Sequence, residues 1–150
     1  MQIVYASTSG NVEFVVETVA DLLVEAGISC TLHRAEQTSI DVIKNNGTFI
    51  LATSTWEHGE INPFFDKLLA EMKTTDMTGK RAAFIGLGDM RYEPVLFNQG
   101  IKLLKSLYLE KGGKDISDLL LIDGEPYNQI DDRIRPWTAK LIEELKNESQ

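Results

Sequence analysis

A run of small polar residues lies near the start of the chain, in the order Ser7, Thr8, Ser9, Gly10 and Asn11. It offers three hydroxyl groups and one side-chain amide, and a helical pattern begins directly after it at Val12. The first N–H groups of a helix have no partners within the helix, and the helix dipole favours negative charge at this end. The run is therefore a candidate phosphate site. The alternative is an ordinary turn that caps the helix.

Cations are missing from this part of the sequence. The first 33 residues contain no Lys or Arg. The run is therefore not a Walker P-loop, which needs a Gly-Lys-Ser or Gly-Lys-Thr end. A cradle without cations suits a permanently bound phosphate monoester better than a triphosphate.

Two further loops follow apolar runs, and each contains one large aromatic residue. The first contains Ser54, Thr55, Trp56, Glu57, His58 and Gly59, and the second contains Gly88, Asp89, Met90, Arg91, Tyr92, Phe97 and Asn98. The faces of Trp56 and Tyr92 could receive a planar ligand, and Gly88 would let backbone groups approach the edge of that ligand. Taken singly, an aromatic residue of this kind is more often packed at the edge of a domain.

The elements that must position these loops follow from hydrophobic periodicity. Apolar runs predict five strands, at Gln2–Ala6, Ile28–Leu32, Thr48–Thr53, Arg81–Leu87 and Leu119–Ile122. Helical spacing predicts helices over Val12–Ala26, Pro63–Met72, Asn98–Tyr108 and a last stretch to about Leu145, with Pro136 in its first turn or at a kink. Strands that alternate with helices form right-handed crossovers. We therefore predict an α/β fold, a three-layer, doubly wound, five-stranded parallel sheet.

In such a sheet, ligands bind beyond the carboxyl ends of the strands, where the strand order reverses. This rule brings together the three loops 7–12, 54–62 and 88–97. A phosphate cradle with two aromatic plates fits a flat heteroaromatic ring that has a phosphate tail. FMN is the economical choice of cofactor.

These motifs resemble those of a known family. The stretch V-Y-A-S-T-S-G-N-V-E resembles the phosphate loop of flavodoxins, and S-T-W and G-D-x-x-Y-E resemble their two isoalloxazine loops. The later stretch L-I-D-G-E-P resembles theirs as well, so the resemblance covers nearly the whole chain. Since nothing is inserted in the fifth strand, the sequence is similar to short-chain flavodoxins. The resemblance implies the strand order 2-1-3-4-5 and a single FMN-binding domain over 1–150.

The resemblance also implies roles for single residues. The phosphate would be held by Ser7, Thr8, Ser9, Gly10, Asn11 and Val12. Trp56 and Tyr92 would enclose the ring, and the backbone of Asp89 would meet its pyrimidine edge. The further candidates for FMN binding are Ser54, Thr55, Glu57, His58, Gly59, Gly88, Met90, Arg91, Phe97 and Asn98. Val12, Glu57 and the pair Met90-Arg91 depart from the family pattern, which usually has Thr, Gly and small polar residues there.

Charge and composition limit the partners of the protein. The 150 residues include 15 Lys or Arg and 23 Asp or Glu, which gives a net charge of −8. This acid excess excludes a typical nucleic-acid binder and favours a partner with a basic face. Two separated histidines and one cysteine argue against a metal site or a disulfide framework. No apolar run approaches the length of a membrane span, and with an unpaired Cys30 we expect a cytoplasmic protein.

The function implied is that of a low-potential one-electron carrier with non-covalently bound FMN. We expect a monomer that serves redox proteins such as a flavodoxin/ferredoxin NADP reductase and turns over no substrate of its own. Acids near the three loops are the docking candidates: Glu57, Glu60, Asp66, Asp89, Glu93, Asp123 and Glu125. The alternative is an FMN-dependent quinone or azo reductase on the same fold. A signalling receiver domain is disfavoured because the ends of the first and third predicted strands lack its acids.

Overall fold

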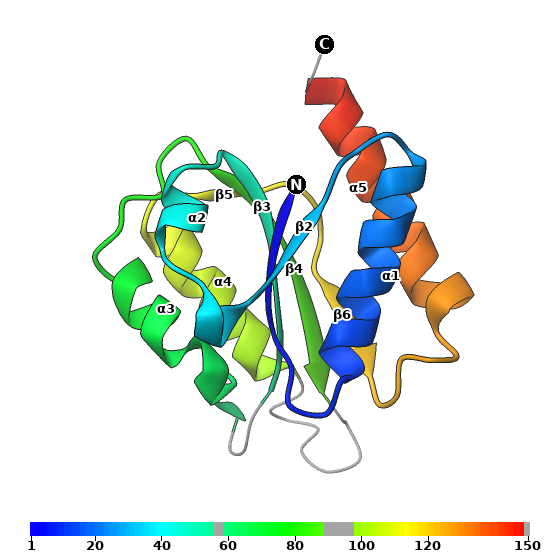
Figure 1. The fold of residues 1–150 in the computed structure, drawn as a ribbon, viewed down its shortest axis with the longest axis horizontal. Helices are drawn as coiled ribbons and strands as arrows, with labels where there is room; N and C mark the ends of the chain where they lie inside the picture. Colours follow the sequence, from blue (N-terminus) through cyan, green and yellow to red (C-terminus); the bar gives the residue numbers. More distant parts are fainter. Residues whose placement is uncertain (56–58, 89–97, 149–150) are drawn as a thin grey trace.

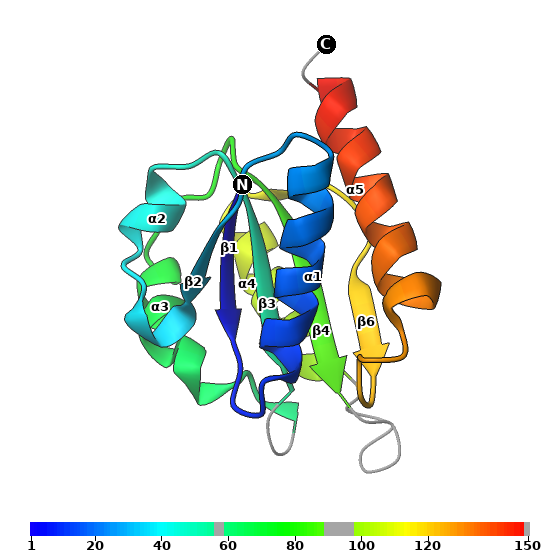
Figure 2. The same cartoon turned by 45° about the vertical axis from the view of Figure 1, so that its right-hand side comes forward.

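The computed structural model describes residues 1–55, 59–88 and 98–148. Its sheet contains the strands β1 (Gln2–Ala6), β2 (Thr31–Arg34), β3 (Thr48–Ser54), β4 (Arg81–Gly88), β5 (Lys114–Asp115) and β6 (Leu120–Asp123). All of these strands pair in parallel, in the order β2-β1-β3-β4, and both β5 and β6 lie beside β4. The predicted parallel sheet with the order 2-1-3-4-5 is confirmed (Figures 1 and 2).

Two strands differ from the prediction by more than one residue at an end. The fifth position holds two pieces, because β5 pairs with Arg81 and Ala82 and β6 pairs with Ile85–Gly88. The sequence predicts a second strand from Ile28, but β2 begins at Thr31, whose N–H donates to the carbonyl of Met1 at 3.0 Å. A strand needs a neighbour, and the β1 ladder that β2 joins begins only at Gln2.

Helices cover both faces of the sheet. They are α1 (Asn11–Glu25), α2 (Asp41–Lys44), α3 (Asp66–Met72), α4 (Gln99–Glu110) and α5 (Arg135–Glu148), with 3₁₀ turns at Ala35–Gln37 and Pro63–Phe65 and a π-helical turn at Ile130–Ile134. Helices α1 and α5 lie on one face, and α2, α3 and α4 lie on the other (Figures 1 and 2). Pro136 is the second residue of α5, which continues without a break from the π-helical turn that ends at Ile134.

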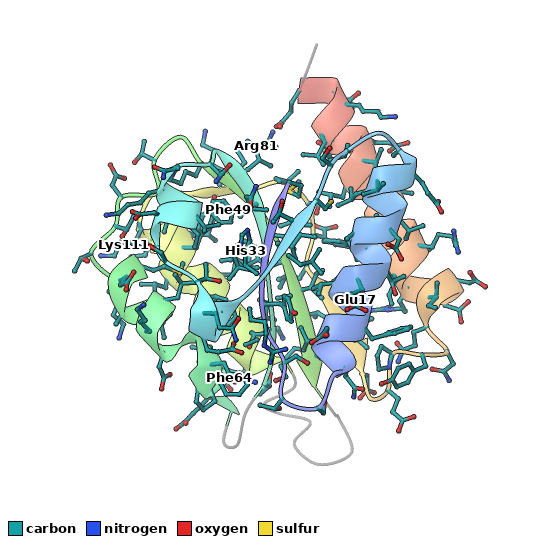
Figure 3. All side chains as sticks on the ribbon, in the orientation of Figure 1. Glu17, His33, Phe49, Phe64, Arg81 and Lys111 are labelled. Atoms are coloured by element: carbon teal, nitrogen blue, oxygen red, sulfur yellow. The ribbon has the colours of Figure 1, made fainter. Side chains whose placement is uncertain are left out.

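The core is divided by the sheet into two clusters. Successive side chains of a strand point to opposite faces, so Ile3 and Tyr5 pack toward α1 and α5, whereas Val4 and Ala6 pack toward α2, α3 and α4. Phe49 belongs to the second cluster and is fully buried there (Figure 3). The sheet is thus covered on both faces, and its carboxyl edge is the place where the strand ends and the loops meet.

Helix α1 follows directly from the sequence pattern. Val12, Val15, Val16, Val19 and Leu23 share one buried face, as their spacing predicts. The helix ends at Glu25, and Gly27 beyond it has φ 87° and lets the N–H of Ile28 bond back to the carbonyl of Leu23 at 2.9 Å. The buried face of this helix and the glycine that follows it are therefore those that the sequence predicts.

Candidate functional site

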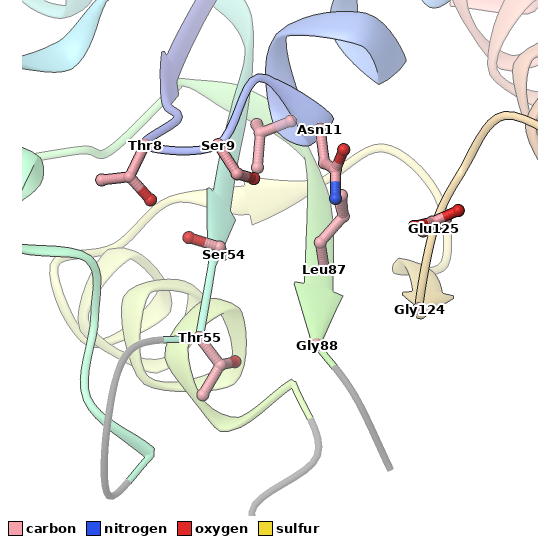
Figure 4. Close-up of a pocket in the computed structure, with 10 residues that line it drawn as sticks. Thr8, Ser9, Asn11, Ser54, Thr55, Leu87, Gly88, Gly124 and Glu125 are labelled. Carbon is pink, nitrogen blue, oxygen red and sulfur yellow. The ribbon is translucent and has the colours of Figure 1, made fainter. Parts of the chain in front are cut away.

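A cavity of about 350 Å³ lies at the carboxyl edge of the sheet (Figure 4). Residues from the ends of β1, β3, β4 and β6 and from the start of α1 line it: Thr8, Ser9, Asn11, Val12, Ser54, Thr55, Leu87, Gly88, Gly124 and Glu125. These described lining residues include no Lys or Arg and a single acid, Glu125. The cavity lies where a doubly wound sheet places its ligand, since β2 and β3 flank β1 on opposite sides.

The loop between β1 and α1 is folded around the side chain of Ser7. Ser7 is buried, and its Oγ accepts hydrogen bonds from the N–H groups of Gly10 at 3.1 Å and Glu13 at 3.4 Å. Gly10 has φ 90°, a conformation that glycine adopts without strain. The bend leaves Thr8, Ser9 and Asn11 facing the cavity (Figure 4).

The start of α1 supplies backbone donors to the same cavity. The first helical hydrogen bond runs from the N–H of Phe14 to the carbonyl of Gly10 at 3.0 Å. The N–H groups of Asn11 and Val12 come before this bond, so they have no acceptor within the helix. Together with the hydroxyls of Thr8 and Ser9 and with the helix dipole, they form a neutral anion site.

The loop after β3 is held tightly at its base. Thr55 donates its N–H to the carbonyl of Leu87 at 2.9 Å and forms an isolated antiparallel β-bridge with Ile61 across the loop. Its Oγ1 accepts from the N–H of Gly100 at 3.1 Å. The amide of Asn62 donates to the hydroxyl of Ser54 at 3.1 Å. A Cβ at Gly100 would lie 3.1 Å from Thr55 Cα, so α4 touches this base with backbone alone. The base is thereby fixed to both β4 and α4.

The predicted site residues fall into three groups. The cavity brings together Thr8, Ser9, Asn11, Val12, Ser54, Thr55 and Gly88. Four others do not line it: Ser7 and Gly10 shape its loop, Gly59 is buried, and Asn98 is fully buried with φ 53° and an amide without a hydrogen-bond partner. The rest lie outside the described residues: Trp56, Glu57, His58, Asp89, Met90, Arg91, Tyr92 and Phe97.

Sequence reasoning missed a fourth wall of the cavity, formed by Gly124 and Glu125 after β6. The N–H of Gly124 donates to the carbonyl of Gly88 at 2.8 Å, which joins this wall to the end of β4. Two residues after Glu125, the hydroxyl of Tyr127 donates to Oδ1 of Asn11 at 2.9 Å. That bond leaves the NH₂ group of Asn11 free to point toward the cavity. This wall could have been predicted from the sequence, because the fifth predicted strand ends at the same edge as the first, third and fourth.

Among residues 1–55, 59–88 and 98–148, no cluster of His, Cys, Asp or Glu has an arrangement that could hold a metal ion. None of the described helices combines the length and apolar character that crossing a membrane requires.

Comparison with known proteins identifies relatives along nearly the whole chain. The family model described as Flavodoxin matches residues 3–137. A flavodoxin from Nitratidesulfovibrio vulgaris is 31% identical over 146 residues, which cover 95% of this chain and 97% of that protein.

Solved structures share the fold. Oxidised flavodoxin 1 from Bacillus cereus superposes with a TM-score of 0.86 at 21% identity and covers 95% of this chain and 96% of its own. A Fusobacterium nucleatum flavodoxin, solved bound to flavin mononucleotide, gives a TM-score of 0.79 at 22% identity, with 98% and 96% covered. On the family match and the sequence relative, this chain belongs to the flavodoxin family.

Proposed function

We propose that this protein carries electrons singly, at low potential, on one non-covalently bound FMN. The observation that supports the proposal most is the neutral anion site at the start of α1. It opens onto the ends of β3 and β4, at the edge where a doubly wound sheet binds its ligand. FMN supplies reversible one-electron chemistry when bound, and the protein supplies binding, orientation and electrostatics.

The phosphate end of FMN fits the residues that are present. The hydroxyls of Thr8 and Ser9, the amide of Asn11 and the N–H groups of Asn11 and Val12 are hydrogen-bond donors that can serve a phosphate monoester without a cation. Ser7 and Gly10 hold the loop that presents them.

The ring end lies toward the loops that begin after Thr55 and Gly88. We propose that Trp56 and Tyr92 enclose the ring and that the backbone of Asp89 meets its pyrimidine edge. The other candidates for contact with FMN on this side are Glu57, His58, Gly59, Met90, Arg91, Phe97 and Asn98.

The partners proposed are redox proteins with a basic docking face, such as a flavodoxin/ferredoxin NADP reductase. The net charge of −8 supports this choice, and so do the exposed acids Glu125, which lines the cavity, and Glu60 and Asp66, which follow β3 along the chain. A rate of electron transfer to such a reductase that falls steeply with ionic strength is expected, because screening weakens the attraction of exposed charges.

The proposal also includes a single FMN-binding domain, a monomer in solution and a cytoplasmic location. The free Cys30 supports the location, since the cytoplasm keeps thiols reduced. No observation favours a quinone or azo reductase, so we propose that the protein turns over no substrate of its own. Steady-state oxidation of NADH with a quinone by the isolated protein would contradict this part.

The deciding experiment is cofactor binding by the purified protein. Apoprotein is titrated with FMN, FAD and riboflavin, and the expected result is tight binding of one FMN per chain and much weaker binding of the other two. Trp56→Ala and Tyr92→Ala serve to test the ring contacts: each is expected to weaken FMN binding and to relieve quenching of flavin fluorescence. Failure of FMN to bind, or a preference for FAD, would overturn the proposal.

A further inference from the structure

The guanidinium of Arg34 lies against the phosphate loop, at the carboxyl end of β2. Its Nη2 donates to the carbonyl oxygen of Ser7 at 2.8 Å, and its Nη1 donates to Oε2 of Glu13 at the same distance. Its Nε donates to Oε1 of Glu36 at 2.5 Å. Every nitrogen of the guanidinium is therefore engaged, and the group also lies 5.6 Å from the ring centroid of Tyr5.

Ser7 connects Arg34 to the whole loop. Arg34 holds the carbonyl of Ser7, while the hydroxyl of Ser7 holds the N–H groups of Gly10 and Glu13. Neither Arg34 nor Ser7 lines the cavity. Arg34 thus acts on the loop from outside the binding site, through a charge-assisted bond to the backbone at the point where the loop begins.

Without a cationic partner, the carboxylate of Glu13 would weaken the binding of an anion at this site. It stands in the first turn of α1, next to the residues that face the cavity, and a carboxylate there repels a bound phosphate. The ion pair with Arg34 opposes that charge. Glu36 in turn binds the same guanidinium, and this hydrogen bond holds the pKa of Arg34 above its ordinary value. The cation therefore remains charged, but two carboxylates share it.

We propose that Arg34 is a positioning residue for phosphate binding. This inference rests on the proposed FMN function. It fixes the loop through the Ser7 carbonyl and offsets the charge of Glu13, so that neutral donors alone face the phosphate. The ligand group that depends on Arg34 is the phosphate, and the flavin ring is independent of it.

The test compares FMN with riboflavin, which has the same ring and no phosphate. In Arg34→Gln, FMN is expected to bind roughly tenfold more weakly, the size expected for loss of a charge-assisted bond that orders a loop. The affinity for riboflavin is expected to stay within about twofold of wild type, which also shows that the variant is folded. Arg34→Lys keeps the charge but not the three-way geometry, and it is expected to fall between wild type and Arg34→Gln.

Glu13→Gln tests the role of charge with the opposite sign. Removal of the carboxylate leaves Arg34 less neutralised, so FMN is expected to bind a few-fold more tightly at low salt. The gain is expected to shrink in high salt, with no change for riboflavin. Glu17→Gln is the matched control, because it removes the same charge one turn later on α1, at an exposed position (Figure 3). The change in the logarithm of the FMN affinity is expected to be less than half as large in Glu17→Gln as in Glu13→Gln.

Three results would overturn the inference. Equal weakening of FMN and riboflavin in Arg34→Gln would mean that Arg34 supports the fold and not the phosphate. No change for either flavin would mean that it supports neither. Weaker FMN binding in Glu13→Gln would contradict the charge argument. Failure of the wild-type protein to bind FMN would instead contradict the proposed function, so the two failures can be told apart.

Discussion

Polar groups at the two edges of the same sheet have different partners. At the amino edge, the hydroxyl of Tyr108 lies 2.9 Å from the carbonyl of Lys80 and 2.8 Å from that of Lys114, and it accepts the N–H of Lys114 at 3.1 Å. The ammonium of Lys80 donates to the carbonyls of Lys44 and Asn46. At the carboxyl edge, the hydroxyls of Thr8 and Ser9 face a cavity instead. The first edge satisfies its polar groups from within the chain, and the second presents them to a ligand.

Gly113 at the amino edge and Gly10 and Gly124 at the carboxyl edge have different surroundings. A Cβ at Gly113, on the amino edge, would lie 2.2 Å from the ring of Tyr108, so this glycine makes room for a side chain of the protein. At the carboxyl edge, nothing lies within 4 Å of a Cβ placed at Gly10 or Gly124. The difference teaches that one edge is built for stability and the other for binding. Substitutions at the two edges should therefore separate into effects on unfolding and effects on FMN affinity.

The largest effect is expected from Gly113→Ala. The added methyl group forces the buried Tyr108 ring to move, and overpacking together with disturbed hydrogen bonds should lower the free energy of unfolding by about 3 kcal/mol. Urea unfolding of the apoprotein measures this. Gly47→Ala is the control at the same edge, because its Cβ meets open space and its φ is not in the left-handed region. Its effect should be within about 0.5 kcal/mol. A similar loss in both variants would contradict the comparison.

Tyr108→Phe should cost about 2 kcal/mol, because it removes the hydroxyl that the carbonyl groups of Lys80 and Lys114 and the N–H of Lys114 share as a hydrogen-bond partner. It should also change the dependence of stability on pH. Burial raises the pKa of Tyr108 to about 12. Between an ordinary pKa of about 10 and that value, the tyrosine ionises in the unfolded chain but not in the folded one, so wild-type stability falls as pH rises. Unfolding at several alkaline pH values should show a shallower fall in Tyr108→Phe. Parallel curves would mean that Tyr108 does not titrate in this way.

Thr8→Val should show the reverse pattern, at the carboxyl edge. Loss of one hydrogen bond to a phosphate should weaken FMN binding by about 1.5 kcal/mol, or roughly tenfold. Since Thr8 is exposed, the stability of the apoprotein should change by less than about 0.5 kcal/mol. Titration with FMN and unfolding without it measure the two quantities separately. A loss of apoprotein stability without a loss of affinity would break the distinction between the edges.

The smallest effect is expected from Val12→Thr. Val12 lines the cavity but is almost fully buried, so a hydroxyl there could reach the phosphate only at some cost to packing. We expect FMN to bind about threefold more tightly, which is under 1 kcal/mol, and riboflavin to bind as before. Titration of the variant with both flavins measures this. Weaker binding of both would show that the loss of packing outweighs the added hydrogen bond.

The sequence predicted what depends on local pattern. The buried face of α1, the glycine after it at Gly27 and the meeting of the ends of β1, β3 and β4 at one edge all follow from periodicity and from the rule for doubly wound sheets. The first turn of α4 was harder to predict from the sequence. Asn98, predicted as a ligand contact, is a buried residue with positive φ, a conformation that Asn adopts more readily than most residues but that its type alone does not require.

Contacts from a side chain to a distant backbone group left no signal in the sequence. Arg34 follows a stretch without cations, and its partner is the carbonyl of a residue 27 positions away, which any residue type could supply. The same is true of the Tyr108 hydroxyl and its carbonyl partners. The wall at Gly124 and Glu125 is different, because the rule that selected the other loops applies equally to the end of β6.

The break in the fifth strand has a consequence for association with other chains. A long, straight edge strand offers a row of free backbone groups to which a foreign strand can add. Here β5 has two residues and β6 has four, and side chains occupy carbonyl groups along them: the indole of Trp137 donates to Asp118 and Arg133 donates to Leu121. The opposite edge, β2, is also only four residues long. Neither edge is therefore a good template for strand addition, which protects the sheet from aggregation through the backbone of its edge strands.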